Sequence, residues 1–392
     1  MIRVLVVEDA QPVALLLQAI LDRQPDLRVV GIASDGAEAL RLTRELRPDV
    51  ITMDVNMPNV DGLEAMRRIM EEMPTPIVVV STEANDPMGN VTFRALDLGA
   101  VAVFGGPPVP GNPRMEAQAK ELAELLRAMA GAKLVRRRPR PDAPPALAEP
   151  VAAPAVPAPP EFPRLLAIAA STGGPQALAT LLTELPANFP LPVVVVQHIS
   201  PGFINGMVDW LNDVIPLRAR LARDGETLKP GGVLFAPDGQ HLLVEQFGAR
   251  LVLKLAQSEP VARHRPSATP LFASIAQSCG ARAIGVVLTG MGADGAPGLV
   301  ELHKAGALTL AQEPRSCVIG SMPQAAINAN AVTEVVPLAQ MAQRIRLGAI
   351  TPVTLGVQTG LADTTLPPPG GLDNGSKQYG TGLKLVGNGG EK

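Results

Sequence analysis

Short apolar runs alternate with amphipathic stretches along the N-terminal part of the chain. The apolar runs are "RVLVV", "LRVVGIA", "VITMD", "PIVVVS" and "VAVFG". Stretches with apolar residues at helical spacing, such as "VALLLQAILDR" and "GLEAMRRIMEE", separate them, and "EAQAKELAELLRAMA" follows the last run. Buried runs alternating with amphipathic helices are typical of a doubly wound parallel sheet. The pattern therefore predicts an α/β domain of five strands and five helices over residues 1–125.

This alternation stops at a segment rich in proline and alanine. "RRRPRPDAPPALAEPVAAPAVPAPPEFP" offers no apolar face, so residues 126–162 are predicted to be a semi-extended linker. Strand-like runs such as "LLAIAA", "LPVVVVQ" and "AIGVVLTG" then alternate with helical stretches over residues 163–349. This predicts a second, mostly parallel α/β sheet, with "HLLVEQ" and "RLVLKLA" as an antiparallel ribbon. Residues 350–392 are Gly-rich and nonperiodic, and are predicted to be disordered.

Composition narrows the classes of function. The 392 residues carry a formal net charge of −3, and only 3% are aromatic, so neither charge nor stacking residues favour nucleic acid or an anionic membrane as partner. No apolar run approaches the ~18 residues that span a bilayer, and the N-terminus lacks the pattern of a signal peptide. The two cysteines, Cys279 and Cys317, have no metal-binding spacing and suggest a reducing compartment. We expect a cytoplasmic protein.

Three carboxylates follow predicted strands of the first domain. Glu8 and Asp9 close the first strand and Asp54 closes the third. Parallel strands that end at one edge share a crevice, and three carboxylates there would repel one another unless a hard cation such as Mg²⁺ lay between them. Asp54 could then attack a phosphoryl group as a nucleophile, with the metal neutralising charge. The alternative is three solvated acids, but their shared placement at strand ends favours the metal site.

These residues resemble the response-regulator receiver family, through "VVEDA", "MDVNMPNVDGL" and "VVVSTEAND". The resemblance implies a flavodoxin-like fold and phosphorylation at Asp54 with a histidine kinase as phosphodonor. It implies a Mg²⁺ site made by Glu8, Asp9, Asp54 and the backbone carbonyl of Asn56. It also implies a switch hydroxyl, either Ser81 or Thr82. The chain departs from the family at Gly106 or its neighbour, where receivers carry a lysine that contacts the phosphoryl group, so whether phosphorylation switches the conformation stays open.

Ser171 raises a separate question in the second domain. It follows the apolar run "LLAIAA", and "TGGP" after it opens a helix. Glycines there permit a tight turn and a close approach of substrate, and a helix N-terminus suits a developing oxyanion. The simpler alternative is that Ser171 or Thr172 only caps the helix. A nucleophilic serine would also need a base.

Among the four histidines, only His198 follows a predicted strand as Ser171 does. His241 begins a strand, His264 lies in a loop between arginines, and His303 is on an amphipathic helix. A histidine base needs an orienting carboxylate, and Asp294 lies in the Gly-rich turn after "AIGVVLTG". The chain order Ser, His, Asp differs from that of α/β-hydrolases. The sequence thus predicts a nucleophile, a base and an orienting acid at one edge of the second sheet.

The second domain resembles the family of protein-glutamate methylesterases of bacterial chemotaxis. The motifs are "AIAASTGGPQAL", "VVVVQHISPGF", "RPSATPLFASIA", "GVVLTGMGADGAPGL" and "MPQAA". The resemblance implies hydrolysis of glutamate methyl esters, and deamidation of glutamines, on the cytoplasmic helices of chemoreceptors, without a cofactor for the esterase. It implies Ser171 as nucleophile, His198 as base and acid, and Asp294 as orienting group. It also implies that Thr172 and the backbone of Met291 stabilise the oxyanion or position His198.

The two resemblances together imply an esterase controlled by phosphorylation and peripheral to its membrane-bound receptors. In the family, the unphosphorylated receiver covers the esterase cleft. The rival hypothesis is a non-enzymatic phospho-switch whose triad is vestigial and whose second domain only binds a partner. Dinucleotide binding through "STGG" is disfavoured because the chain has no G-x-G-x-x-G at that point.

Overall fold

The computed structural model describes residues 1–55, 57, 62–81, 91–106, 115–131 and 164–350. Asn56 and Thr82, together with the predicted tail and almost all of the predicted linker, lie outside the described residues. No helix in the described ranges is long and apolar enough to cross a membrane.

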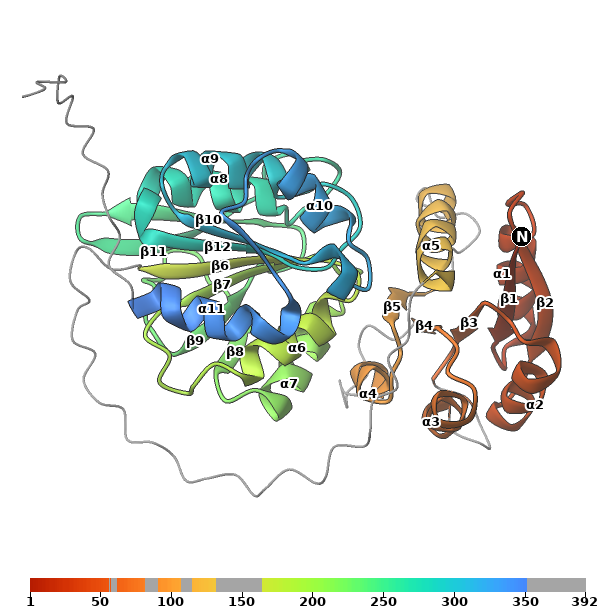
Figure 1. Cartoon of the computed structure of the whole chain (residues 1–392). Coiled ribbons are helices and arrows are strands. Elements are labelled where there is room, and N and C mark those ends of the chain that lie inside the picture. Colours follow the sequence, from red (N-terminus) through yellow and green to blue (C-terminus); the bar gives the residue numbers. More distant parts are fainter. Residues whose placement is uncertain (56, 58–61, 82–90, 107–114, 132–163, 351–392) are drawn as a thin grey trace, which may run out of the picture. The chain divides into compact units, whose positions relative to one another are not determined.

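The N-terminal domain is a five-stranded parallel sheet in the order β2-β1-β3-β4-β5 (Figure 1). Its strands are β1 (Ile2–Val7), β2 (Leu27–Ala33), β3 (Val50–Met53), β4 (Ile77–Ser81) and β5 (Ala102–Gly105). Its helices are α1 (Gln11–Leu21), α2 (Gly36–Leu46), α3 (Gly62–Glu72), α4 (Val91–Asp97) and α5 (Met115–Ala130). The strand order is that of flavodoxin-like folds, so the predicted fold is confirmed.

Helix α5 corrects the predicted end of this domain. The boundary at residue 125 falls inside the helix, which continues to Ala130. The reason is that the buried stripe of α5 goes on past that point, because Leu126 and Met129 are both fully buried. Burial of apolar side chains, rather than the change to a Pro-rich composition, sets where this helix ends.

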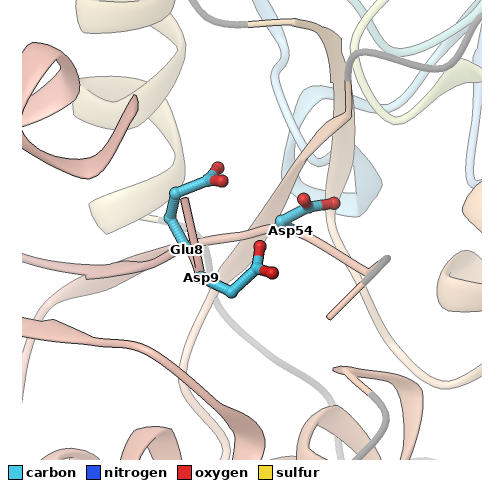
Figure 2. A group of neighbouring side chains, drawn as sticks. All are labelled: Glu8, Asp9 and Asp54. Carbon is cyan, nitrogen blue, oxygen red and sulfur yellow. The ribbon is translucent and has the colours of Figure 1, made fainter. Parts of the chain in front are cut away.

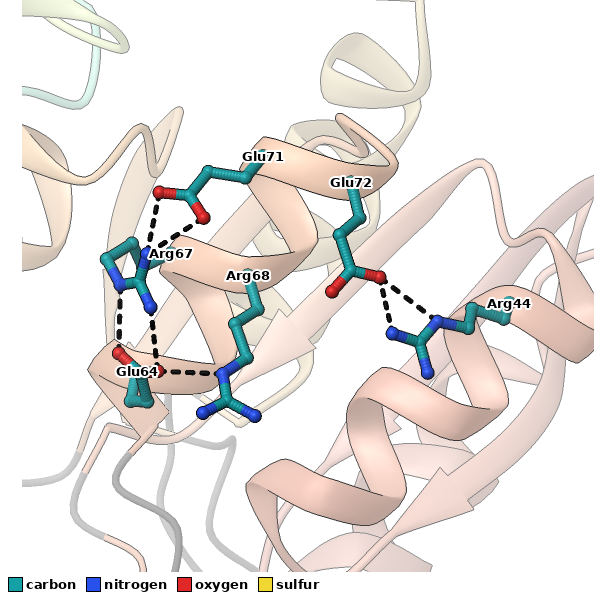
Figure 3. Close-up of polar contacts among 6 residues, drawn as sticks. All are labelled: Arg44, Glu64, Arg67, Arg68, Glu71 and Glu72. Carbon is teal, nitrogen blue, oxygen red and sulfur yellow. Dashed lines mark hydrogen bonds and ion pairs between the residues drawn. The ribbon is translucent and has the colours of Figure 1, made fainter. Parts of the chain in front are cut away.

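Helix α3 shows how the sequence divides a helix between core and solvent. Its apolar positions, such as Met66 and Ile69, are fully buried. The other face carries Arg67 between two glutamates, 2.8 Å from Glu64 and 2.7 Å from Glu71 (Figure 3). Figure 3 also shows further ion pairs, Arg68–Glu64 and Arg44–Glu72, the second of which joins α2 to α3. Because these side chains are exposed and solvent screens their charges, the pairs add little to stability, and burial determines how the helix packs.

The second domain is a seven-stranded parallel sheet in the order β14-β13-β12-β6-β7-β9-β8, with a separate antiparallel pair, β10-β11. Its strands are β6 (Leu165–Ala170), β7 (Val193–Gln197), β8 (Arg218–Leu221), β9 (Gly232–Phe235), β10 (His241–Phe247), β11 (Arg250–Ala256), β12 (Ala283–Val287), β13 (Leu308–Gln312) and β14 (Glu334–Val336). The predicted mostly parallel sheet with its antiparallel ribbon is therefore confirmed. The apolar pattern did not predict the edge strand β8, "RARL", because only one of its four residues is fully buried.

Helices cover both faces of this sheet. They are α6 (Gly174–Thr183), α7 (Ile204–Val214), α8 (Ala268–Ser278), α9 (Ala296–Lys304), α10 (Ser321–Asn328) and α11 (Leu338–Ile350). Figure 1 shows α8, α9 and α10 on one face and α6, α7 and α11 on the other. The central strands β6, β7 and β12 are buried along their whole length. This double cover explains why they read as continuous apolar runs, and it fixes the edge at which their carboxyl ends meet.

Candidate active site

Ser171 and His198 lie next to each other where two neighbouring strands end. Strands β6 and β7 pair in register through Ala170 and Gln197, and the His198 amide donates to the Ala170 carbonyl at 2.9 Å. The side-chain amide of Gln197, a residue only 3% exposed, donates to the backbone carbonyls of both Ser171 and His198, each at 2.8 Å. Strand register and one buried amide therefore hold the serine and the histidine at the same edge of the sheet.

Asp294 reaches this edge from the turn after β12. Its Oδ2 atom lies 2.9 Å from Nε2 of His198; the Asp294 side chain is buried and that of His198 is 9% exposed. The oxygen lies off the direction of the ring N–H, so the contact is a close approach rather than an aligned hydrogen bond. The other ring nitrogen, Nδ1, is buried and has no hydrogen-bond partner among the described residues. Nδ1 is thus the nitrogen left to exchange a proton with a substrate or nucleophile.

The environment of Asp294 keeps its carboxylate ionised. Burial alone would raise the pKa of the Asp294 carboxyl. The contact with His198 and the hydrogen bonds from Ser267 and the Ala268 amide outweigh burial and lower that pKa below its usual range. The group is therefore an anion beside the imidazole throughout the neutral pH range, as an orienting carboxylate must be.

A second group of titratable side chains lies at the strand ends of the N-terminal domain. Glu8, Asp9 and Asp54 each offer an oxygen, and these oxygens all lie within 4.8 Å of one another (Figure 2). Burial, followed by the neighbouring Asp54 carboxylate, raises the pKa of Glu8 to about 7. Both causes disfavour the charged form of Glu8, and a nearby cation would offset them. A set of carboxylate oxygens suits Mg²⁺. The residues present therefore fit the metal that the receiver resemblance implies.

The other predicted receiver residues are less completely defined. Ser81 is the last residue of β4, whereas Asn56 and Thr82 lie outside the described residues. Gly106 follows β5 with φ of 73°, in the left-handed region. A lysine at this point of the backbone would be strained. The backbone conformation therefore favours the glycine that stands in place of the usual lysine.

Comparison with known proteins shows two regions of similarity. Residues 166–345 match the CheB methylesterase family and residues 4–104 match the response regulator receiver domain. A protein-glutamate methylesterase/protein-glutamine glutaminase of Myxococcus xanthus is 48% identical over 350 residues, which cover 88% of this chain and 96% of the relative. The chain belongs to the CheB methylesterase family. Two further relatives bear the same name. The one from Anaeromyxobacter dehalogenans is 48% identical over 88% of this chain and 99% of its own length. The one from Geobacter metallireducens is 43% identical over 86% of this chain and 96% of its own length.

Membership of the CheB family confirms the resemblance drawn from the motifs. The loop after β12 lies close to Ser171. A Cβ atom on Gly290 would lie 2.7 Å from Cβ of Ser171 and 2.3 Å from Sδ of Met322, so only glycine allows this approach. The next residue is Met291, whose amide makes no hydrogen bond within the described part of the chain, and the same holds for the amide of Thr172. These two predicted oxyanion donors therefore have N–H groups available near Ser171.

His264 is the site residue that sequence reasoning set aside. Its position in a loop between arginines gave no sign of an ordered place. In the structure its ring stacks flat on that of His198, with centroids 4.1 Å apart and planes 3° apart. Burial, followed by the proximity of His198, lowers the pKa of His264 to about 4. This CheB-family chain therefore covers one face of the candidate base with a neutral aromatic ring at neutral pH.

A cavity of about 730 Å³ lies elsewhere in the domain. It is lined by residues of β8, β9, the loop between them and the start of β11, including Arg218, Lys229 and Arg250. None of the residues Ser171, His198 and Asp294 lines it. This cavity is therefore separate from the strand ends that carry Ser171 and His198.

Proposed function

We propose that this chain is a phosphorylation-controlled serine hydrolase that demethylates glutamate methyl esters, and deamidates glutamines, on the cytoplasmic helices of chemoreceptors. The relatives are named protein-glutamate methylesterase/protein-glutamine glutaminase, which supports the two hydrolytic activities. The single observation that supports it best is the contact of Nε2 of His198 with Oδ2 of Asp294, at 2.9 Å, at the strand ends where the backbone of Ser171 also lies. A hydroxyl, an imidazole and a buried anion in this order are the parts of a nucleophilic triad.

The reaction proposed for these residues has two halves. Nδ1 of His198 takes the proton of the Ser171 hydroxyl while Oγ attacks the ester carbonyl, and Asp294 stabilises the imidazolium that forms. The amides of Thr172 and Met291 donate to the oxyanion. The imidazolium returns its proton to the departing methoxide, which leaves as methanol. Water then attacks the acyl-enzyme with His198 again as base, which releases glutamate and regenerates Ser171. With glutamine as substrate, the same steps release ammonia.

The N-terminal domain supplies the proposed control. Asp54 would accept a phosphoryl group from a histidine kinase, and Glu8 and Asp9 complete the oxygen set around it. Mg²⁺ held by these residues would neutralise charge on the phosphoryl group. Gly106 leaves this site without the usual lysine, so the metal would carry a larger share of the charge neutralisation.

Methanol release from a methylated receptor tests this function directly. Ser171→Ala should abolish release, because it removes the nucleophile, yet leave the labelling of Asp54 by acetyl phosphate intact. Asp54→Asn is the matched control, which should lose labelling and keep basal release. A fully active Ser171→Ala protein would remove Ser171 from the mechanism. A wild-type protein that neither releases methanol nor reacts with a serine-directed phosphonate would favour the non-enzymatic phospho-switch.

A further inference from the structure

The carboxylate of Asp294 is bound at the N-terminus of a helix that is not its own. Ser267 and Thr269, which flank the first residue of α8, both donate their hydroxyls to Oδ1, at 2.6 Å and 2.8 Å. The amide of Ala268 donates to Oδ2 at 2.7 Å, and the amide of Thr269 donates to Oδ1 at 3.3 Å. Ser267 is fully buried and Asp294 is 3% exposed. A buried anion thus receives four hydrogen bonds from three consecutive residues.

These donors are distributed unequally over the two carboxylate oxygens. Oδ1 receives both hydroxyls and one amide, whereas Oδ2 receives one amide and faces Nε2 of His198. Rotation of the carboxylate about its bond to Cβ would break the bonds to Oδ1. The geometry assigns Ser267 and Thr269 as positioning residues that fix the orientation of Asp294, and through it the ring of His198, for the hydrolysis proposed above. This assignment rests on the proposed function.

Ordinary helix capping does not account for the two hydroxyls. A cap satisfies the free N–H groups of the first turn, and Ser267 already accepts from the Thr269 amide at 3.2 Å. The hydroxyl protons of Ser267 and Thr269 play no part in capping, because both hydroxyls donate to the carboxylate of Asp294. Oγ1 of Thr269 also accepts from the amide of Gly295 at 3.0 Å. Thr269 therefore holds both the side chain of Asp294 and the backbone that follows it.

The test compares two substitutions of Thr269 in the full-length chain, one that removes the hydroxyl and one that keeps it. Thr269→Val keeps the branched shape but removes the hydroxyl, while Thr269→Ser keeps the hydroxyl. With methylated receptor as substrate, we expect Thr269→Val to lower kcat by about tenfold to a hundredfold, as for a misplaced catalytic group, with KM nearly unchanged. Thr269→Ser should restore most of the rate.

Two further measurements separate positioning from folding and from the function itself. In an Asp294→Asn background, Thr269→Val should add little to the loss, since coupled residues are not additive. The second measurement is the rate at which a fluorophosphonate labels Ser171, which needs no receptor. If the wild type labels but releases no methanol, the substrate assignment fails and the labelling rates still decide the role of Thr269. Equal kcat in Thr269→Val and wild type would overturn the positioning role, as would a wild type that does not label.

Discussion

The stacking of His264 on His198 makes the stability of the protein depend on pH. His264 lies on His198, and its pKa is lowered to about 4, first by burial and then by His198. In the unfolded chain a histidine titrates near 6.5. Between these two pH values the unfolded state binds the additional proton, so the free energy of unfolding must fall as pH is lowered through this window. Above pH 6.5 His264 is neutral in both the folded and the unfolded state, so it no longer changes the free energy of unfolding with pH.

His264→Phe tests this sign, because phenylalanine keeps a flat ring but cannot be protonated. We expect the variant to lose less stability than the wild type between pH 6.5 and 4, and to match its pH dependence between pH 6.5 and 9. The only tryptophan of the chain, Trp210, is buried in the second domain, so its fluorescence reports unfolding there. A variant whose stability falls as steeply as that of the wild type below pH 6.5 would mean that His264 is not held neutral.

At the scale of elements, the packing of α8 against α9 sets the position of the residues that bind the Asp294 carboxylate. Gly298 of α9 faces the first turn of α8, and a Cβ atom there would lie 2.1 Å from the carbonyl oxygen of Thr269. Alanine favours a helix over glycine by about 1 kcal/mol. Here the clash with backbone should reverse that sign, because neither helix can move without disturbing a packed core.

We therefore expect Gly298→Ala to destabilise the second domain by about 1–3 kcal/mol, the usual cost of overpacking, and to slow ester hydrolysis by displacing Thr269. Denaturant unfolding followed by Trp210 fluorescence measures the first effect and methanol release the second. Glu301→Ala, at an exposed position of the same helix, is the control and should change stability by no more than about 0.5 kcal/mol. A Gly298→Ala protein more stable than the wild type would show that α8 and α9 adapt to the added atom.

The strand ends explain how far the sequence alone could lead. Ser171 and His198 were predictable because each closes an apolar run, and parallel strands place their carboxyl ends at one edge. Ser267 and His264 were not, because each reaches the site from a loop, and the Ser267–Asp294 contact joins residues 27 positions apart. No periodicity encodes such a contact. Gln197 could have been predicted as a site residue, because it is a polar residue that ends the buried run "VVVVQ".

Regulation belongs to the whole molecule, where an esterase and a receiver share one chain. If the receiver inhibits the esterase, as the family resemblance implies, inhibition is a coupling free energy between two sites, typically about 1–3 kcal/mol. Removal of residues 1–160 should then raise basal methanol release by about fivefold or more. The same deletion removes Asp54, so the shortened protein should no longer respond to a phosphodonor.

The decisive comparison uses four proteins with and without acetyl phosphate. The full-length chain should be slow and become faster with the phosphodonor, whereas Asp54→Asn should stay slow in both conditions. The chain without residues 1–160 should be fast in both, and the same deletion with Ser171→Ala should be inactive, which ties the rate to the proposed nucleophile. Because Gly106 removes the usual cation from the phosphorylation site, the response of the full-length chain also measures whether the receiver still switches. A truncated protein no faster than the full-length chain would contradict inhibition by the receiver, whatever the effect of the phosphodonor.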